Sequence, residues 1–278
     1  MDSMKNIIDN VAAKAPEMPE RAVKGDDGLF YCPVCKKPLQ VKITIFDTER
    51  IVRCVCRCER EEEERKEEAI ARRDFMRKVD RLRRAGFPDE EMQRWKFETD
   101  DGSNEKLTKT LHAYVDKFDT FAETGKGLLL WGSVGTGKTF AAACIANALI
   151  DKGVPVLMTN FARLANTLQG MFSGRQEYID KLCNFPLLII DDLAAERRTE
   201  YMQEIIFNII DSRYRSGKPM IITTNLTLQE IKSPSNVADG RCFDRILERC
   251  FPLEVNGASR RRKKIVADYE KTKTLLGL

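Results

Sequence analysis

The segment GSVGTGKT, at positions 132–139, has residue types and spacing that suit phosphate binding. It fits the pattern G-x-x-x-x-G-K-[ST] and lies between the apolar run GLLLWG (127–132) and the helix-like run KTFAAACIANALI. Glycines let backbone N–H groups turn toward phosphates, and the next helix presents its positive N-terminus to them. Lys138 is expected to reach the β- and γ-phosphates of a nucleotide, and Thr139 to bind Mg²⁺. The residues predicted to line the loop are Gly132, Ser133, Val134, Gly135, Thr136, Gly137, Lys138 and Thr139.

Two acids at the end of an apolar run, LLIIDD at 187–192, could complete such a site. A carboxylate at the end of a buried strand is costly unless it serves a cation, so Asp191 is predicted to bind Mg²⁺ through water. Asp192, or Glu196 a few residues later, is predicted to polarise the attacking water. The alternative is that these carboxylates only cap the turn after the strand.

A further apolar run, PMIITTN at 219–225, ends in an amide. If this strand lies beside the strand that carries Asp191, Asn225 would face the same cleft and could orient water against a γ-phosphate. Spacing alone does not establish that strand order, and Asn is also common in turns at strand ends.

Three arginines recur every four residues in DGRCFDRILER (239–249) and would line one helix face. They are Arg241, Arg245 and Arg249. One interpretation is a solvated face paired with nearby acids. The other is that one arginine reaches the γ-phosphate held by a neighbouring subunit and stabilises transition-state charge there.

Five of the nine cysteines lie within residues 32–58, as CPVC and CVCRC, separated by the strand-like segments QVKITIF and RIVRC. Four thiolates suit tetrahedral Zn²⁺, and a hairpin between two cysteine groups would bring them together. We favour Cys32, Cys35, Cys56 and Cys58 as ligands, with Cys54 as a possible substitute. The alternative, buried reduced cysteines, fits poorly because the neighbouring residues are strongly polar. Such a small module would depend on its metal and is expected to serve structure or interaction rather than catalysis.

The arrangement of these segments predicts an α/β protein. Apolar runs without polar alternation, separated by helix-like runs, indicate a parallel sheet covered by helices on both faces. The expected divisions are an N-terminal arm at 1–28, a zinc-binding module at 29–60, a connecting helix at 61–85 and an ATPase domain at 86–278. No run approaches the ~20 apolar residues that a membrane span needs. The N-terminus has no signal-peptide pattern, so a cytoplasmic location without membrane partners is expected.

Taken together, these segments resemble the AAA+ ATPases, and among them the bacterial and phage helicase-loader family of the DnaC/DnaI type, close to the IstB-like transposition helpers. The resemblance rests on KFDTFAETGKGLLLWGSVGTGKT, LLIIDDLAAE, IITTN, RCFDRILERC and NGASRRRKK, and covers roughly residues 84–272. The upstream CPVC…RCVCRCERE is similar to the zinc-binding module of many such loaders.

The resemblance implies specific roles for several residues. Lys138 and Thr139 would belong to the Walker A motif, and Asp191 and Asp192 to Walker B, which ends in Asp-Asp where most AAA+ proteins have Asp-Glu. Asn225 would be sensor 1. Arg245 is the first choice for an arginine acting on a neighbour, with Arg241 second, and Arg261 is the expected sensor 2 contact.

The resemblance also implies a function. The protein would bind ATP, Mg²⁺ and Zn²⁺, grip a hexameric replicative helicase of the DnaB type and bind single-stranded DNA. It would associate with copies of itself through the ATP site, and hydrolysis would release the helicase onto DNA. The alternatives are an ATPase helper of a transposase, a small-molecule kinase, and an adaptor in which ATP is only structural.

Overall fold

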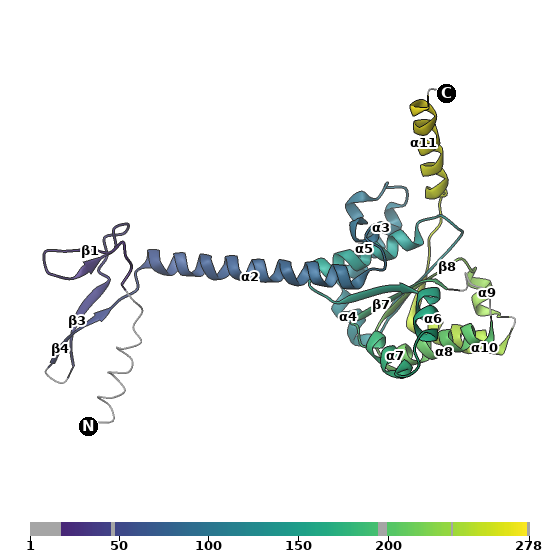
Figure 1. Ribbon diagram of the computed structural model, residues 1–278, viewed down its shortest axis with the longest axis horizontal. Coiled ribbons are helices and arrows are strands. Elements are labelled where there is room, and N and C mark those ends of the chain that lie inside the picture. Colours follow the sequence, from purple (N-terminus) through teal and green to yellow (C-terminus); the bar gives the residue numbers. More distant parts are fainter. Residues whose placement is uncertain (1–17, 46–47, 194–198, 235, 277–278) are drawn as a thin grey trace. The chain divides into compact units, whose positions relative to one another are not determined.

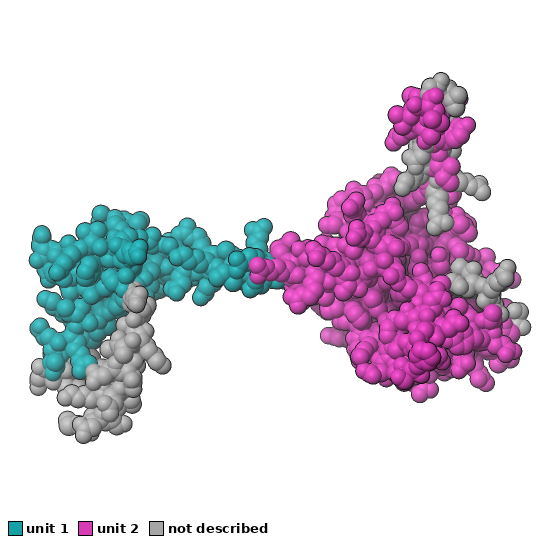
Figure 2. All heavy atoms as spheres, in the orientation of Figure 1, with its two compact units in different colours: residues 1–75 teal, residues 76–278 magenta. Residues whose placement is uncertain are grey.

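A computed structural model describes residues 18–45, 48–193, 199–234 and 236–276 of the 278-residue chain. The side chains of Ile45 and of residues 261–264, 266–268 and 270 lie outside this description. The chain forms two compact units, Met1–Phe75 and Met76–Leu278, coloured separately in Figure 2. The division between them falls within one helix, α2 (Arg57–Gly86). Each unit is described by itself below.

The first unit contains two small antiparallel sheets. Strand β1 (Val23–Lys24) pairs with β2 (Phe30–Tyr31), and β3 (Gln40–Ile45) pairs with β4 (Thr48–Arg53). Three buried residues, Cys32, Leu39 and Cys56, form its core. A core of this size is too small to stabilise a fold, so other links are needed.

The second unit begins with the end of α2 and several short helices. These are the 3₁₀ turns η1 (Met92–Arg94) and η2 (Phe97–Thr99), and helices α3 (Glu105–Asp116) and α4 (Phe118–Thr124). Strands and helices then alternate: β5 (Gly127–Trp131), α5 (Lys138–Asp151), β6 (Val156–Asn160), α6 (Phe161–Gln169), α7 (Arg175–Cys183), β7 (Leu187–Leu193), α8 (Glu200–Arg215), β8 (Met220–Thr224), α9 (Leu228–Lys232), α10 (Val237–Arg249), β9 (Cys250–Glu254) and α11 (Arg260–Leu275).

The five strands form one parallel sheet in the order β6-β7-β8-β5-β9. Successive residues of a strand point to opposite faces, so a strand buried on both sides must be apolar throughout. In β5, Leu128 and Leu130 join the core formed with α3, α4 and α5, whereas Leu129 joins the core formed with α6, α7, α8 and α10. Helices accordingly cover both faces of the sheet (Figure 1). The predicted α/β class with a parallel sheet flanked by helices is confirmed.

A buried arginine ties two strands of this sheet together. The Arg213 side chain is fully buried, and its Nη1 donates to the carbonyl oxygens of Cys183 and Phe185, each at 2.7 Å. Its Nη2 donates to the carbonyl oxygens of Pro186, at 3.2 Å, and Pro219. Burial lowers the pKa of the guanidinium to about 10. Arg213 therefore fixes the start of β7 relative to the start of β8, the two strands that carry predicted site residues.

The four cysteines of the second unit, Cys144, Cys183, Cys242 and Cys250, are buried among its apolar side chains. Burial raises the pKa of the Cys144 thiol to about 12, which leaves it protonated at neutral pH. Within the described residues, no helix is both long enough and apolar enough to cross a membrane.

Candidate nucleotide site and metal centre

Three predicted site segments meet because of the strand order. Strand β8 lies between β5 and β7, and all three run parallel. The phosphate loop follows β5, Asp191 lies near the end of β7, and Asn225 follows β8. Since the carboxyl ends of parallel strands share one sheet edge, a ligand there contacts all three segments. The condition on which the Asn225 assignment depended, that its strand lies beside that of Asp191, is met.

The phosphate loop turns directly into the N-terminus of α5. Gly137 precedes this helix with a φ of 100°, a left-handed conformation that glycine adopts without strain. Lys138 is buried in the loop, and its Nζ donates to the carbonyl oxygens of Gly132 at 3.0 Å and Ser133 at 2.8 Å. The ammonium group is thus held where the helix N-terminus would also attract an anion.

Asp191 combines burial with a defined hydrogen bond. Its side chain is 7% exposed, and its Oδ1 accepts from Thr223 Oγ1 at 2.6 Å. The same hydroxyl oxygen accepts from the backbone N–H of Asp192 at 2.9 Å. Burial, followed by repulsion from Asp192, raises the pKa of Asp191, while Thr223, Thr139 and Lys138 oppose that rise. A carboxylate that is costly to ionise in isolation gains most from a nearby divalent cation, so Asp191 and Thr139 suit Mg²⁺.

A local irregularity in β7 exposes the next acid to the same space. The register between β7 and β8 shifts between Ile190 and Leu193, and Asp192 has a φ of 56°. Asp192 consequently lines a cavity of 510 Å³ at the end of the sheet. The residues around this cavity are Glu91, Trp95, Val134, Gly135, Gly137, Lys138, Thr139, Phe140, Asp192, Asn225 and Arg260. Glu196, the alternative base, lies outside the described residues.

Several residues of this site gave no separate signal in the sequence. Thr223 was visible only as part of the TTN segment, and its role depends on the pairing of β7 with β8. Trp95 is brought to the cavity by Asn147, a buried residue of α5 whose amide donates to the carbonyl oxygens of Met92 and Trp95 at 2.9 and 2.8 Å. Such long-range contacts cannot be inferred from local spacing.

Arg260, at the start of α11, also lines this cavity. Its backbone N–H donates to the carbonyl oxygen of Gly135 at 2.9 Å, and its guanidinium lies over the Phe140 ring at 5.0 Å from the ring centre. Arg261, the residue expected to make the sensor 2 contact, belongs to the same helix, but its side chain lies outside the described part of the chain.

The arginines of α10 differ in their surroundings. Arg245 forms an ion pair with Asp211 at 2.7 Å, and its guanidinium carbon lies 4.8 Å from the centre of the Phe207 ring. Arg249 packs over Tyr214, whereas the Arg241 side chain is exposed. On the predicted helix face, Arg245 is therefore held by its neighbours, whereas Arg241 is exposed.

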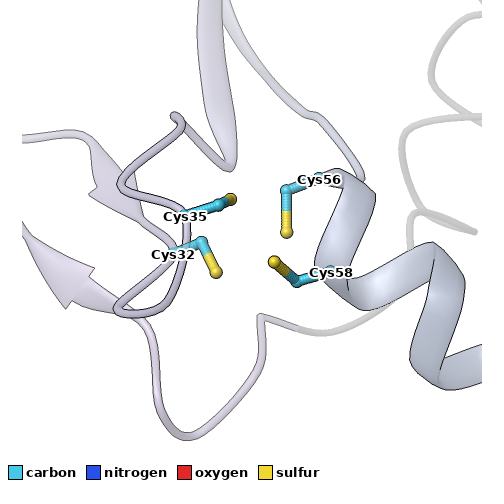
Figure 3. Close-up of side chains that lie close together, drawn as sticks. All are labelled: Cys32, Cys35, Cys56 and Cys58. Carbon is cyan, nitrogen blue, oxygen red and sulfur yellow. The ribbon is translucent and has the colours of Figure 1, made fainter.

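In the first unit, four of the five clustered cysteines converge. The Sγ atoms of Cys32, Cys35, Cys56 and Cys58 all lie within 4.8 Å of one another, and Figure 3 shows them gathered around one point. Cys54 is not part of this group. Tetrahedral Zn²⁺ with ligands at ~2.3 Å would place the sulfur atoms about 3.8 Å apart, so a small contraction would close the site.

The pKa values of these thiols and the repulsion between their thiolates would favour a bound cation. Backbone N–H groups of Cys35 and Val34 help to lower the pKa of Cys32 to about 7. Burial raises the pKa of Cys56, and the hydrogen bond to Cys35, followed by burial, raises that of Cys58 to about 11. Four thiolates at this separation repel one another, and a divalent cation removes that repulsion. The cluster fits a zinc-binding module.

The fold and the site define a P-loop nucleotide-binding protein of the AAA+ type. The sequence profile of the IstB-like ATP binding protein family matches residues 61–267, and the chain belongs to this family. The resemblance predicted from the sequence motifs is thereby confirmed.

The chain is similar to two kinds of protein. It is 28% identical over 204 residues to the replicative helicase loader DnaI of Bacillus subtilis, a match that covers 68% of this chain and 65% of the relative. It is also 28% identical over 207 residues to a putative ATP-binding protein in an insertion sequence of Mycobacterium tuberculosis, covering 72% of this chain and 79% of the relative. The chain thus matches slightly less than two thirds of the DnaI length.

Solved structures show the same fold. A crystal structure of DnaI has a TM-score of 0.54 with 25% identity, covering 65% of this chain and 99% of that chain. A crystal structure of the DnaC helicase loader has a TM-score of 0.52 with 27% identity, covering 60% of this chain and all of that chain (100%).

Proposed function

We propose that this protein is an ATP-dependent loader that places a hexameric replicative helicase on single-stranded DNA. The observation that carries the proposal is that one unit has a phosphate loop with acids at the same sheet edge, while the other unit has a four-cysteine cluster. The nucleotide site supplies a two-state signal, and the cysteine unit supplies a separate surface for a protein partner.

The nucleotide site has the parts that hydrolysis requires. Lys138 would bind the β- and γ-phosphates, while Thr139 and, through water, Asp191 would hold Mg²⁺. Asp192 would polarise the attacking water, and Asn225 would orient it. In this proposal hydrolysis changes the affinities for partners, so the coupling between states matters more than a high turnover.

Single-stranded DNA would be bound by basic side chains and an aromatic platform. Two aromatic residues follow β6 as candidates for this contact: Phe161 is buried in the core, whereas Phe172 is fully exposed between α6 and α7. An exposed ring is available for base stacking, which tolerates any sequence. Phe172 is therefore the residue we assign to this contact.

The alternative function is that of an ATPase helper of a DNA transposase. Its nucleotide site would be the same, and the relatives include proteins of both kinds. The cysteine cluster at residues 32–58 lies before the family match at 61–267, which favours a chain with an additional partner-binding element. A small-molecule kinase is disfavoured because the chain instead offers Asn225 beside the phosphate loop, an arginine-bearing helix and a cysteine cluster.

The test is capture of the replicative helicase from the same source by the full chain. We expect the wild-type chain to form the complex and to release the helicase onto a single-stranded oligonucleotide when ATP is hydrolysed, whereas Lys138→Ala should not release it. In the DNA arm, Phe172→Ala should weaken oligonucleotide binding, while Phe251→Ala, another exposed aromatic, serves as its control. Binding to a transposase but to no helicase would establish the alternative.

A further inference from the structure

The start of α11 lies directly on the phosphate loop. A Cβ atom built at Gly135 would come within 2.3 Å of Ser259 Oγ, and one built at Gly137 within 2.9 Å of Arg260 Nε. The backbone hydrogen bond from Arg260 to Gly135 holds the two segments in register. The Arg260 side chain therefore crosses the glycine that precedes α5, beside the place where a helix N-terminus binds phosphate.

Two carboxylates of the segment before α3 hold this arginine. Arg260 Nη2 lies 2.7 Å from Asp100 Oδ1 and 3.3 Å from Asp101 Oδ1, and it donates to Ser103 Oγ at 3.3 Å. Asp100 is in turn fixed, because its Oδ2 accepts from Thr108 Oγ1 of α3 at 2.7 Å. The side chains of Asp100 and Arg260 are only 9% and 24% exposed, so this ion pair is screened less than a surface pair.

The charges around Arg260 would allow it to exchange its carboxylate partners for a phosphate. Two carboxylates contact one guanidinium beside a site for phosphates, so a bound phosphate would compete with them for Arg260. Arg260 gains little by attracting a phosphate while both carboxylates neutralise it, and the carboxylates themselves repel a nucleotide. The contact between Arg260 Nη2 and Asp100 Oδ1 is an ion pair without a hydrogen bond. It is therefore weaker than a hydrogen-bonded contact between Arg260 and a phosphate would be.

We propose that Asp100 and Asp101 form a latch. They hold Arg260, and with it the start of α11, until a bound nucleoside triphosphate replaces them as the ion-pair partner of Arg260. This regulation rests on the proposed nucleotide site. Nucleotide affinity is then set by competition between carboxylate and phosphate for one guanidinium. Occupancy of the site is transmitted to α11 because Arg260 is the first residue of that helix.

The test measures the affinity of the full chain for a fluorescent ATP analogue with Mg²⁺. Asp100→Asn keeps an oxygen that can accept from Thr108 and removes one competing charge. It should tighten binding by about fivefold, the effect of one partly exposed ion pair. Asp101→Asn should act in the same direction and tests the latch if Asp100→Asn does not fold. Asp116→Asn, at the opposite end of α3, is the matched control and should leave the affinity unchanged.

A double-mutant cycle separates the latch from simple charge repulsion. Arg260→Gln should weaken binding, and adding Asp100→Asn to Arg260→Gln should then give a smaller gain than Asp100→Asn gives in the wild type. An equal gain with and without Arg260 would overturn the latch, as would unchanged or weaker binding by both aspartate variants. Hydrogen exchange of amides 256–265 supplies a second readout, because Asp100→Asn should mimic the change that nucleotide causes in the wild type. If the wild-type chain bound no nucleotide at all, the proposed function itself would fail.

Discussion

At the scale of single residues, Asp191 has a carboxylate whose charge is unfavourable in the absence of a cation. Burial raises the pKa of Asp191, so the folded chain disfavours its ionised form more than the unfolded chain does. Ionising Asp191 therefore opposes folding. This destabilising contribution is absent below the ordinary pKa of an aspartate, grows as the pH rises through the higher folded pKa, and is complete above it.

Replacing Asp191 by Asn should stabilise the metal-free protein at pH 7. The amide oxygen can still accept from Thr223, and no buried charge remains. For a unit of this size, a gain of ~1 kcal/mol would raise Tm by about 2–4 °C, and the gain should shrink as the pH falls into the range where aspartate protonates. Mg²⁺-dependent ATP turnover should be lost. Calorimetry and a phosphate-release assay measure both effects, with the exposed Asp89→Asn as control; a lower Tm for Asp191→Asn would contradict the argument.

Residue types and spacing were sufficient to predict the phosphate loop, because Gly132, Gly137, Lys138 and Thr139 each meet a chemical requirement of the motif. They were not sufficient to predict Arg260. The sequence offers Arg260, Arg261 and Arg262 in a row, and only the hydrogen bond to Gly135 and the contacts with Asp100 and Asp101 distinguish the first of them. Those partners lie far away along the chain.

At the scale of elements, strands β5, β7 and β8 of the large sheet could be predicted from their apolar runs. Strand β9 gave a weaker signal, because Cys250–Glu254 contains Pro252 and lies at the sheet edge. The order of the strands could not be predicted, since local periodicity says nothing about which strands pair. Helix α2 begins at Arg57, so Cys58 lies within its first turn, whereas the connecting helix was expected from residue 61.

The hairpin of the first unit should depend on its metal. Removing zinc with a chelator leaves four thiols around a very small core, so β3 and β4 should lose their structure while the large sheet of the second unit persists. The purified chain should hold about one zinc ion, which Cys56→Ser should lose.

Cys54→Ser is the matched variant for this prediction, because Cys54 is in the same segment but outside the four-cysteine group. It should keep its zinc. Mass spectrometry measures the zinc content of Cys54→Ser and Cys56→Ser. Equal loss in the two variants would mean that the ligand set differs from the one proposed, and a folded, zinc-free hairpin would refute the dependence itself.

At the scale of the whole molecule, the proposed self-association requires each chain to supply an arginine to a neighbour. Arg245 is the first choice for this role. Asp211 and Phe207 hold its guanidinium in place, and its side chain is 26% exposed. Such a fixed group loses little conformational freedom when it contacts a phosphate, provided that the phosphate replaces Asp211. Arg241 is more exposed and less constrained.

Mixing two inactive variants tests the sharing of sites between chains. Lys138→Ala lacks a working phosphate site but keeps its arginines, whereas Arg245→Ala keeps the phosphate site. ATP turnover should therefore return when the two are mixed, and Arg241→Ala should remain active without a partner. Activity that returns only in mixtures containing Arg241→Ala would assign the role to Arg241. If Arg245→Ala alone turned over ATP normally, the role proposed for Arg245 would be wrong.

The position of β8 also determines when the molecule becomes able to bind its ligand during synthesis. Strand β5 pairs with β8 and β9, both of which are made after the phosphate loop and after β7. A chain still emerging from the ribosome thus carries its phosphate loop on a strand without a neighbour until Met220–Thr224 inserts between β5 and β7. Nucleotide binding would then report that β5 is joined to β7 through β8, and chains halted before β8 would expose an unpaired apolar strand to aggregation and proteolysis.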